Sequence, residues 1–307
     1  MNAEADRKLV IAILVDERRD LMAIDIVAHS RKLSEGTSGE LLRFSRQQAG
    51  WEWMGLEVKR LSPGEIWKYQ QNEEETVFVL LSGRCSADWG GGAHNIGQRT
   101  SVFDGLPYTL YLSPGSEVQF EASTTCEIAA CHVPAKANFA SRLVTPRDVQ
   151  VSLRGGGNAS RQIVDVMRPD FPAERLIVVE VYTPGGNWSS YPPHKHDVHK
   201  PPTEVDLDEI YYYRMNRVGA FAHQRLYTRD GRRDTVVTVH DGDAVLVRDG
   251  YHPVVAGPGY DIYYLNFIAG SARSLAVTED PDHVWIRDVW KGFDARLPLV
   301  TAAESGT

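Results

Sequence analysis

The sequence predicts an all-β protein built from two tandem β-barrels, and three observations lead to this fold class. Short β-prone runs separated by turn signals such as Pro63-Gly64 and Pro114-Gly115 recur along most of the chain. The two halves also repeat one plan, because each opens with a strand and a Pro-Gly turn, the second time at Pro184-Gly185. Finally, no amphipathic helical pattern dominates either half. A duplicated barrel accounts for all three observations.

The predicted strands divide the chain into domains. We expect residues 1–45 to be an N-terminal extension of unknown role, 141–175 to connect the barrels and 286–307 to form a C-terminal tail. The first barrel is expected at 46–140 and the second at 176–285. Strands are predicted in the first at 57–61, 76–81, 108–112 and 127–131, and in the second at 176–182, 220–227, 234–239, 244–247 and 260–267.

Composition narrows the class of partner. The chain has 307 residues, 42% hydrophobic and 24% charged, which suffices for two domains with their own cores. A net charge of -8 argues against a nucleic-acid or anionic-membrane partner, since both require clustered basic residues. Three cysteines without a Cys-x-x-Cys pair suit a reducing, cytoplasmic compartment. We therefore expect a small-molecule substrate, and assembly into a homo-oligomer stays open.

The apolar run at 9–15 is the one segment that could resemble a targeting signal. It is followed at once by charged residues rather than by a small-residue cleavage site, and a membrane span needs about twenty apolar residues. We expect a buried strand or a short helix there.

His194-Lys195-His196 is the strongest chemical signal in the chain. Two imidazoles one residue apart on a strand project to the same side, which is the geometry needed to hold a metal ion. Glu209 opens a β-prone run, and His252 follows a turn after another apolar run. These four side chains predict one divalent metal ion in the second barrel. Nitrogen-rich ligation with one carboxylate suits zinc, manganese, iron or nickel alike.

The order of these residues resembles the cupin superfamily. Its two sequence blocks correspond here to Pro184-Gly185 leading into the histidine pair and Glu209, and to Gly242-Asp243 leading through Gly250 to His252. The resemblance implies jelly-roll barrels, one of which holds the metal on three histidines and one glutamate. Two features depart from the usual pattern.

The gap from His196 to Glu209 is longer than usual, and Arg248 stands where a proline is common. The long gap leaves both Glu204 and Glu209 as possible carboxylate ligands. Glu209 is favoured because it adjoins the β-prone run at 210–213.

Longer motifs are similar to the 5-deoxy-glucuronate isomerases of inositol catabolism. They lie at 189–197, 209–214, 221–228, 250–254 and 259–266, and the first half agrees at 80–83 and 101–108. The resemblance implies isomerisation of 5-deoxy-D-glucuronate, a sugar-acid aldose, to the ketose 5-dehydro-2-deoxy-D-gluconate. Nothing like the histidine pair recurs at the matching place near 67–70, so the first barrel is expected to be metal-free and structural.

Five further residues are candidates for the chemistry. Tyr211 and Tyr213 share a face with Glu209, and Gln224 lies on a neighbouring strand, so these three could reach the barrel lumen as catalytic groups. Arg225 and Arg161 are candidates for binding the substrate carboxylate. The competing classes are a cupin-type metal-dependent dioxygenase and a non-catalytic cupin that binds a metal or a sugar, because all three share the ligand set.

Overall fold

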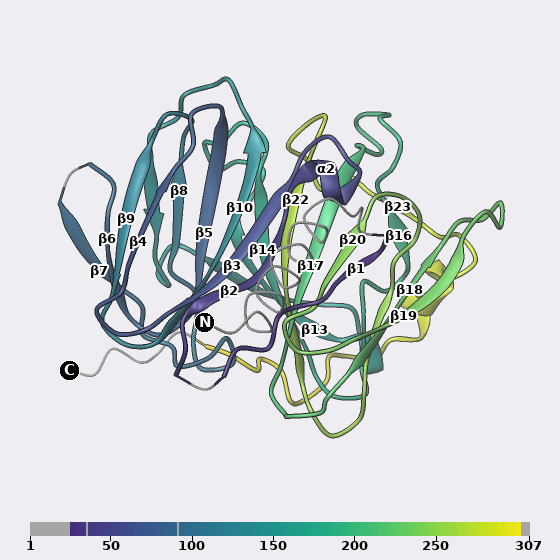
Figure 1. Cartoon of the computed structure of the whole chain (residues 1–307). Coiled ribbons are helices and arrows are strands. Elements are labelled where there is room, and N and C mark those ends of the chain that lie inside the picture. Colours follow the sequence, from purple (N-terminus) through teal and green to yellow (C-terminus); the bar gives the residue numbers. More distant parts are fainter. Residues whose placement is uncertain (1–24, 35, 91, 302–307) are drawn as a thin grey trace, which may run out of the picture.

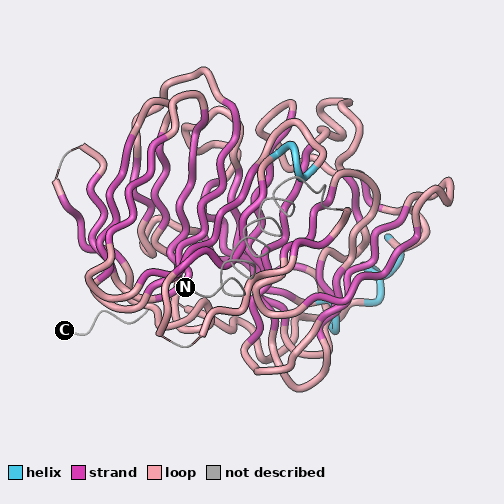
Figure 2. The backbone as a smooth tube through the Cα atoms, in the orientation of Figure 1, coloured by secondary structure: helices cyan, strands magenta, loops and turns pink. Residues whose placement is uncertain are grey.

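The structure is a computed structural model that describes residues 25–34, 36–90 and 92–301. The apolar run at 9–15 lies outside these residues. In the described part of the chain, no helix has both the length and the apolar character needed to cross a membrane. Strands dominate, as predicted, and helices are few and short (Figure 2).

The first barrel consists of two antiparallel sheets that face one another. Aromatic residues from both sheets, including Trp67, Phe78 and Phe120, fill the space between them. A short helix, α2 (Arg46–Ala49), precedes β3 and is capped by Ser45. One sheet contains β2 (Gly39–Phe44), β3 (Gly55–Leu61), β5 (Glu74–Ser82), β8 (Thr109–Leu112), β10 (Cys126–Pro134) and β11 (Arg142–Val144). The other contains β4 (Ile66–Gln70), β6 (Cys85–Asp88), β7 (Ala93–Ile96) and β9 (Glu117–Ala122).

The second barrel pairs a large sheet with two smaller ones. The large sheet contains β1 (Val27–Ala28), β12 (Gln150–Arg154), β13 (Arg161–Met167), β14 (Ile177–Thr183), β17 (Leu207–Met215), β20 (Ala244–Val247) and β22 (Ile262–Gly270). A second sheet contains β15 (Trp188–Ser189), β18 (Ala222–Tyr227), β19 (Asp234–Val239) and β21 (Val254–Ala256). The third is a two-stranded pair of β16 (His194–Lys195) and β23 (Thr278–Glu279).

The two barrels share a hydrophobic layer where their larger sheets meet (Figure 1). On β5, Val77 and Val79 point into this layer, whereas Phe78 points into the first barrel. On β14, Val178 lies in the shared layer and Val179 in the second barrel. Because both faces of these sheets are buried, their strands read as continuous apolar runs rather than as an alternation.

The structure extends the barrels beyond two predicted boundaries. The span 141–175, expected as a connection, contains β12 and β13, which continue the large sheet of the second barrel. The span 1–45 contains β1, which pairs with β20 of the second barrel, and β2, which pairs with β3 of the first. β1 was missed because it has only two residues, and β12 because none of its residues is fully buried.

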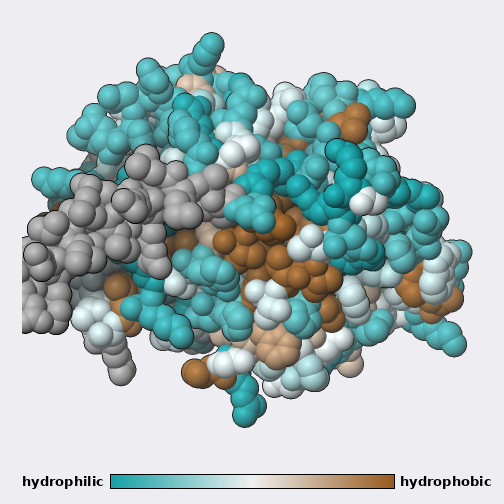
Figure 3. Space-filling model, turned by 45° about the vertical axis from the view of Figure 1, so that its right-hand side comes forward, coloured by the Kyte–Doolittle hydropathy of each residue, from teal (hydrophilic) through white to brown (hydrophobic). Residues whose placement is uncertain are grey.

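The end of the chain returns to the second barrel. After the 3-10 helix η2 (Val284–Val289), Val300 packs into the shared hydrophobic layer. The Gln162 side chain exchanges hydrogen bonds with the main chain of Leu299 and Val300. The face in Figure 3 is mostly hydrophilic, with a hydrophobic area near the middle of the view.

Candidate metal centre

Three elements bring the predicted metal ligands together. His194 lies on β16, and His196 follows directly after it. Glu209 lies on β17 of the large sheet, and His252 precedes β21 of the opposite sheet. The ligands therefore come from both walls of the second barrel, as expected for residues that converge in a lumen.

The donor atoms of His196, Glu209 and His252 all lie within 4.8 Å of one another, and all three residues are buried. The Nε2 atoms of His196 and His252 are 3.1 and 3.3 Å from the same oxygen, Oε2 of Glu209. His194 stands beside this group: its ring centroid is 4.9 Å from that of His252 and 6.4 Å from that of His196. The structure thus gathers all four predicted ligands, three of them in a tight cluster.

The protonation of two imidazoles is fixed by the main chain. Nδ1 of His196 lies 2.9 Å from the Leu207 oxygen, and Nδ1 of His252 lies 2.9 Å from the Gly250 oxygen. A carbonyl oxygen can only accept, so both Nδ1 atoms carry a proton, and each ring turns its Nε2 toward Glu209.

The two Nε2 atoms provide a test of whether a metal ion fits. Nε2 of His252 is buried and has no hydrogen-bond partner among the described residues. Lone pairs of two nitrogens around one carboxylate oxygen repel unless a cation or a proton lies among them. Nitrogen and oxygen ligands bind a first-row ion at about 2.0–2.2 Å, which places neighbouring ligand atoms about 3 Å apart. The observed separations and the unpartnered nitrogen therefore suit a divalent metal ion.

Charges at the centre follow from the same contacts. Burial raises the pKa of Glu209, but the His196 and His252 rings lower it more, to about 2, so this carboxylate is ionised. Burial lowers the pKa of His194 well below its usual range, and the neighbouring imidazoles lower it further. For His196, the Glu209 carboxylate outweighs burial and raises the pKa. An ionised carboxylate beside a neutral His194 is the state that a metal site requires.

A cavity of about 420 Å³ opens beside the ligands. Tyr211 lines it, as predicted, and its hydroxyl lies 3.0 Å from Oγ of Ser190. Tyr264 also lines it, with its hydroxyl 2.5 Å from Oγ of Ser189. Ser190 has a φ of +51°, a strained value for a residue with a side chain.

Tyr213 and Gln224 lie behind the centre rather than in the cavity. Both are fully buried, and neither is among the residues that line the space. The Tyr213 hydroxyl donates to Oε1 of Gln224 at 2.8 Å, and Nε2 of Gln224 donates to the His252 oxygen at 3.3 Å. Tyr213 packs in the core of the second barrel and Gln224 is buried beside it, so both lie inside the barrel as expected. Their polar atoms are used in holding His252 rather than facing the cavity, and a catalytic role for them stays a prediction.

The two predicted arginines have different surroundings. Arg161 lines the cavity, and its Nη1 donates to the main-chain oxygens of Tyr191 and Ala159 at 2.8 and 3.3 Å. No carboxylate of the described residues pairs with it, and burial lowers the pKa of its guanidinium.

Arg225 is wrong as a candidate, because it points outward. Successive residues of a strand alternate in direction, so buried Gln224 places Arg225 on the solvent side. There it pairs with Asp234, at 2.7 Å from Nε to Oδ1, and lies over the Tyr227 ring.

Glu204 has a different task from Glu209. Its Oε1 accepts hydrogen bonds from the main-chain N–H groups of Asp197 and Val198 and from Lys195 Nζ, and its Oε2 accepts from Thr278. These bonds organise the loop between His196 and β17, so the longer gap in the sequence is a folded loop that does not displace Glu209.

Several lining residues were not predicted from the sequence. Tyr264 and Asn266 belong to a strand that is buried along its whole length, so its sequence shows no alternation that would identify the face lining the cavity. Glu279 and Arg287 come from a segment that follows the predicted strands. The one sequence signal for these lining residues was a polar residue such as Asn266 within an otherwise apolar strand, because a buried polar group needs a partner.

Comparisons with known proteins agree with this architecture. The sequence pattern of the KduI/IolB family matches residues 27–286. A 5-deoxy-glucuronate isomerase of Geobacillus thermodenitrificans is 41% identical over 261 residues, which cover 83% of this chain and 94% of that protein. One from Bacillus licheniformis is 38% identical and covers 75% and 86%, respectively.

Two solved structures extend the comparison. A crystal structure of an IolB-like protein from Salmonella typhimurium LT2 has a TM-score of 0.82 and 37% identity, and it covers 86% of this chain and 99% of that one. A Bacillus subtilis oxalate decarboxylase mutant has a TM-score of 0.58 at 13% identity, covering 84% and 80%. The chain thus shares with these structures a fold of two jelly-roll barrels in tandem.

Proposed function

The chain belongs to the KduI/IolB family, and we propose that it isomerises 5-deoxy-D-glucuronate to 5-dehydro-2-deoxy-D-gluconate in inositol catabolism. One divalent metal ion, held by His194, His196, Glu209 and His252, would serve this reaction. The observation that carries the proposal is the buried, unpartnered Nε2 of His252 beside an ionised Glu209, in a chain 41% identical to an isomerase of that name.

The cavity suits a sugar acid that lies with one end at the ligands. Arg161 offers a guanidinium without a protein carboxylate at the cavity wall, and guanidinium binds carboxylate through paired hydrogen bonds. We assign Arg161 to the substrate carboxylate. The aldehyde end of the open-chain sugar then lies toward His194 and Glu209.

The reaction moves hydrogen between neighbouring carbons through an enediolate. A divalent metal bound at the centre supplies a positive charge for the oxygens on which negative charge develops. The protein groups orient the sugar and exclude water. Tyr211 and Ser190 form a hydroxyl pair at the cavity wall through which an O–H proton can pass. Tyr213 and Gln224 keep His252 in place. Zinc, manganese, iron and nickel all suit the ligand set.

The activity test uses the purified, metal-loaded protein with 5-deoxy-D-glucuronate, while NMR follows the sugar and an electrode follows oxygen. We expect formation of the ketose with no oxygen consumed. Oxygen consumption would instead identify a dioxygenase, and binding without turnover would identify a non-catalytic cupin. Protein stripped of metal by a chelator is the control, and its activity should return on adding a divalent metal.

Metal content tests the ligand assignment independently of activity. We expect His194→Ala combined with His196→Ala to abolish the stoichiometric metal found by elemental analysis. His199→Ala is the matched control, because that exposed ring pairs with Asp206 on the surface. Full metal content in the double variant would show the assignment to be wrong.

A further inference from the structure

The isomerase reaction needs a base that removes a proton from carbon, and the cavity offers three carboxylates. Among the described residues that line it, the acidic ones are Asp165, Glu209 and Glu279. Glu209 is occupied by the His196 and His252 rings. The hydroxyls of Tyr211 and Tyr264 contact Oγ of Ser190 and Ser189, and a phenol is protonated at neutral pH, so neither is a ready base.

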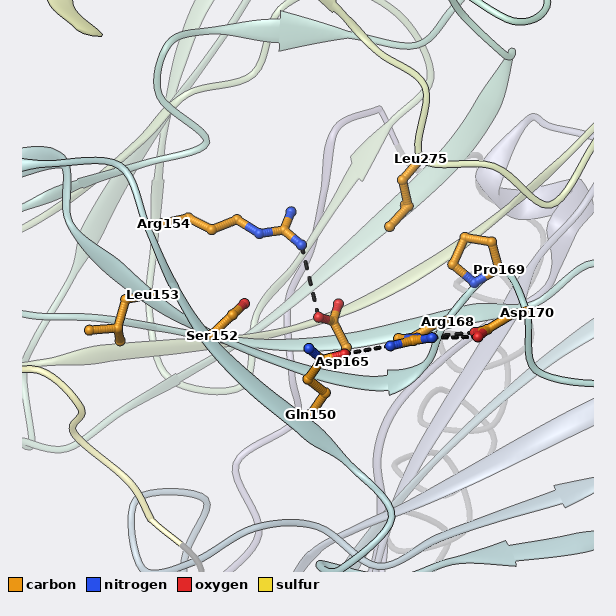
Figure 4. Close-up of a pocket in the computed structure, with 9 residues that line it drawn as sticks. All are labelled: Gln150, Ser152, Leu153, Arg154, Asp165, Arg168, Pro169, Asp170 and Leu275. Carbon is orange, nitrogen blue, oxygen red and sulfur yellow. Dashed lines mark hydrogen bonds and ion pairs between the residues drawn. The ribbon is translucent and has the colours of Figure 1, made fainter.

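Asp165 lies far from the metal ligands. Asp165 is on β13 and pairs with Val179 on β14, which pairs with Asn266 on β22. Asn266 in turn pairs with Tyr211 on β17, the strand that carries Glu209. Three steps between neighbouring strands span about 14 Å. Asp165 faces Arg154, with 3.9 Å between Oδ2 and Nη2, in an outer hollow that adjoins the cavity (Figure 4).

Glu279 lies next to the ligands. It is the direct cross-strand partner of His194 in the pair of β16 and β23. Directly opposed residues of antiparallel strands point to the same side with Cβ atoms about 4.5–5.5 Å apart, and both side chains line the cavity. The Arg287 guanidinium donates to the Glu279 carboxylate through Nε and Nη2. Glu279 is outside the cluster of donor atoms formed by His196, Glu209 and His252.

Building on the isomerase activity proposed above, we propose that Glu279 is the general base that carries the proton between the two reacting carbons, with Arg287 as its positioning residue. Glu279 takes the proton from the hydroxyl-bearing carbon next to the aldehyde. The electron pair of that C–H bond forms the double bond of the enediolate, and the carbonyl pair moves onto the aldehyde oxygen.

The same carboxyl then returns the proton to the former aldehyde carbon. The hydroxyl hydrogen of the second carbon passes to the oxygen of the first, which leaves the ketone. The first carbon is reduced as the second is oxidised, so the step needs no external oxidant or reductant. A carboxylate beside a group that stabilises the enediolate oxygens is the arrangement that this chemistry requires.

The test is Glu279→Gln, which keeps the shape of the side chain and removes the base. We expect kcat to fall by about 10²–10⁴-fold, with KM within about threefold of wild type. Metal content measured by elemental analysis should be unchanged. Glu279→Asp should recover part of kcat, because Asp restores a carboxylate, although its shorter side chain holds that carboxylate farther from the substrate. Asp282→Asn is the matched control, an exposed carboxylate three residues along the same segment, and it should leave kcat unchanged.

Other outcomes overturn the assignment. Retention of kcat in Glu279→Gln would exclude Glu279 as the base, and loss of metal would make it a ligand instead. A loss of kcat confined to Asp165→Asn would move the role to Asp165. If wild type itself fails to isomerise the sugar, the proposed function fails as well, and this result is distinct from an active wild type with an equally active variant.

Discussion

Arg99 of the first barrel and Glu180 of the second form a buried ion pair, with 2.7 Å between Nη2 and Oε1. The tyrosines Tyr182 and Tyr263 donate to the same carboxylate. The buried positive charge of the first barrel is therefore neutralised by the buried negative charge of the second.

We expect Arg99→Met to destabilise the protein by about 3–5 kcal/mol, because it leaves the Glu180 charge buried without its cation. Urea unfolding measures the change. Arg168→Met is the control, because its pair with Asp170 is on the surface, where water screens it, and should contribute little to stability. Equal losses in both variants would contradict the role given to Arg99.

The carboxylate ligand can be identified by two single substitutions. Glu209→Gln should reduce metal content and isomerase turnover sharply, because the ionised oxygen between two imidazoles is lost. Glu204→Gln changes a carboxylate of the neighbouring loop and should leave the metal in place, although the loop loses charge-assisted bonds. The reverse pattern would transfer the ligand role to Glu204.

Arg161→Met should raise the KM for 5-deoxy-D-glucuronate by about 10- to 100-fold, since a hydrogen bond to a charged group contributes about 1.5–3 kcal/mol. Steady-state kinetics give the value. Arg225→Met removes an exposed arginine of the same barrel and should leave KM unchanged. An unchanged KM in Arg161→Met would place the substrate carboxylate elsewhere.

Glu127 provides a pH-dependent contribution to stability. Burial raises its pKa, but Arg214 and Arg60 lower it more, so the net shift is downward from 4.5. A carboxyl whose pKa is lowered by folding stabilises the protein above its unfolded pKa and loses this effect as pH falls through the folded value. The stability difference between wild type and Glu127→Gln should therefore be largest at neutral pH and should narrow below about pH 4.5.

Denaturant unfolding at a series of pH values checks this prediction. A difference that stays constant down to pH 3 would mean that the contacts of Glu127 with Arg60 and Arg214 do not depend on its charge.

The sequence was sufficient for the parts of the fold governed by local pattern. The predicted strands at 234–239 and 244–247 coincide with β19 and β20, because alternating or continuous apolar residues bounded by turns specify them locally. The grouping of the four proposed metal ligands was also predicted, starting from His194 and His196, which are two positions apart and therefore point the same way along a strand. Arg225 could have been excluded by the same rule, once Gln224 was assigned to the interior.

The rest depends on contacts between distant segments. Glu279 meets His194 through two strands of two residues each, 85 positions apart, and no local pattern marks such a pair. The shared layer between the barrels was hidden for a different reason. Its strands are apolar on both faces, so the sequence shows that they are buried but not what covers them.

The hydrophobic layer shared by the two barrels has a consequence for how the chain can be divided. The link between β11 and β12 contains the exposed Arg147, where trypsin can cut. The N-terminal fragment would keep β1, which pairs with β20 of the other fragment, and both fragments would contribute to the same core. Neither piece could leave without exposing that core to water. The nicked protein should therefore elute as one species, and the two pieces, made as separate polypeptides, should reassemble by complementation.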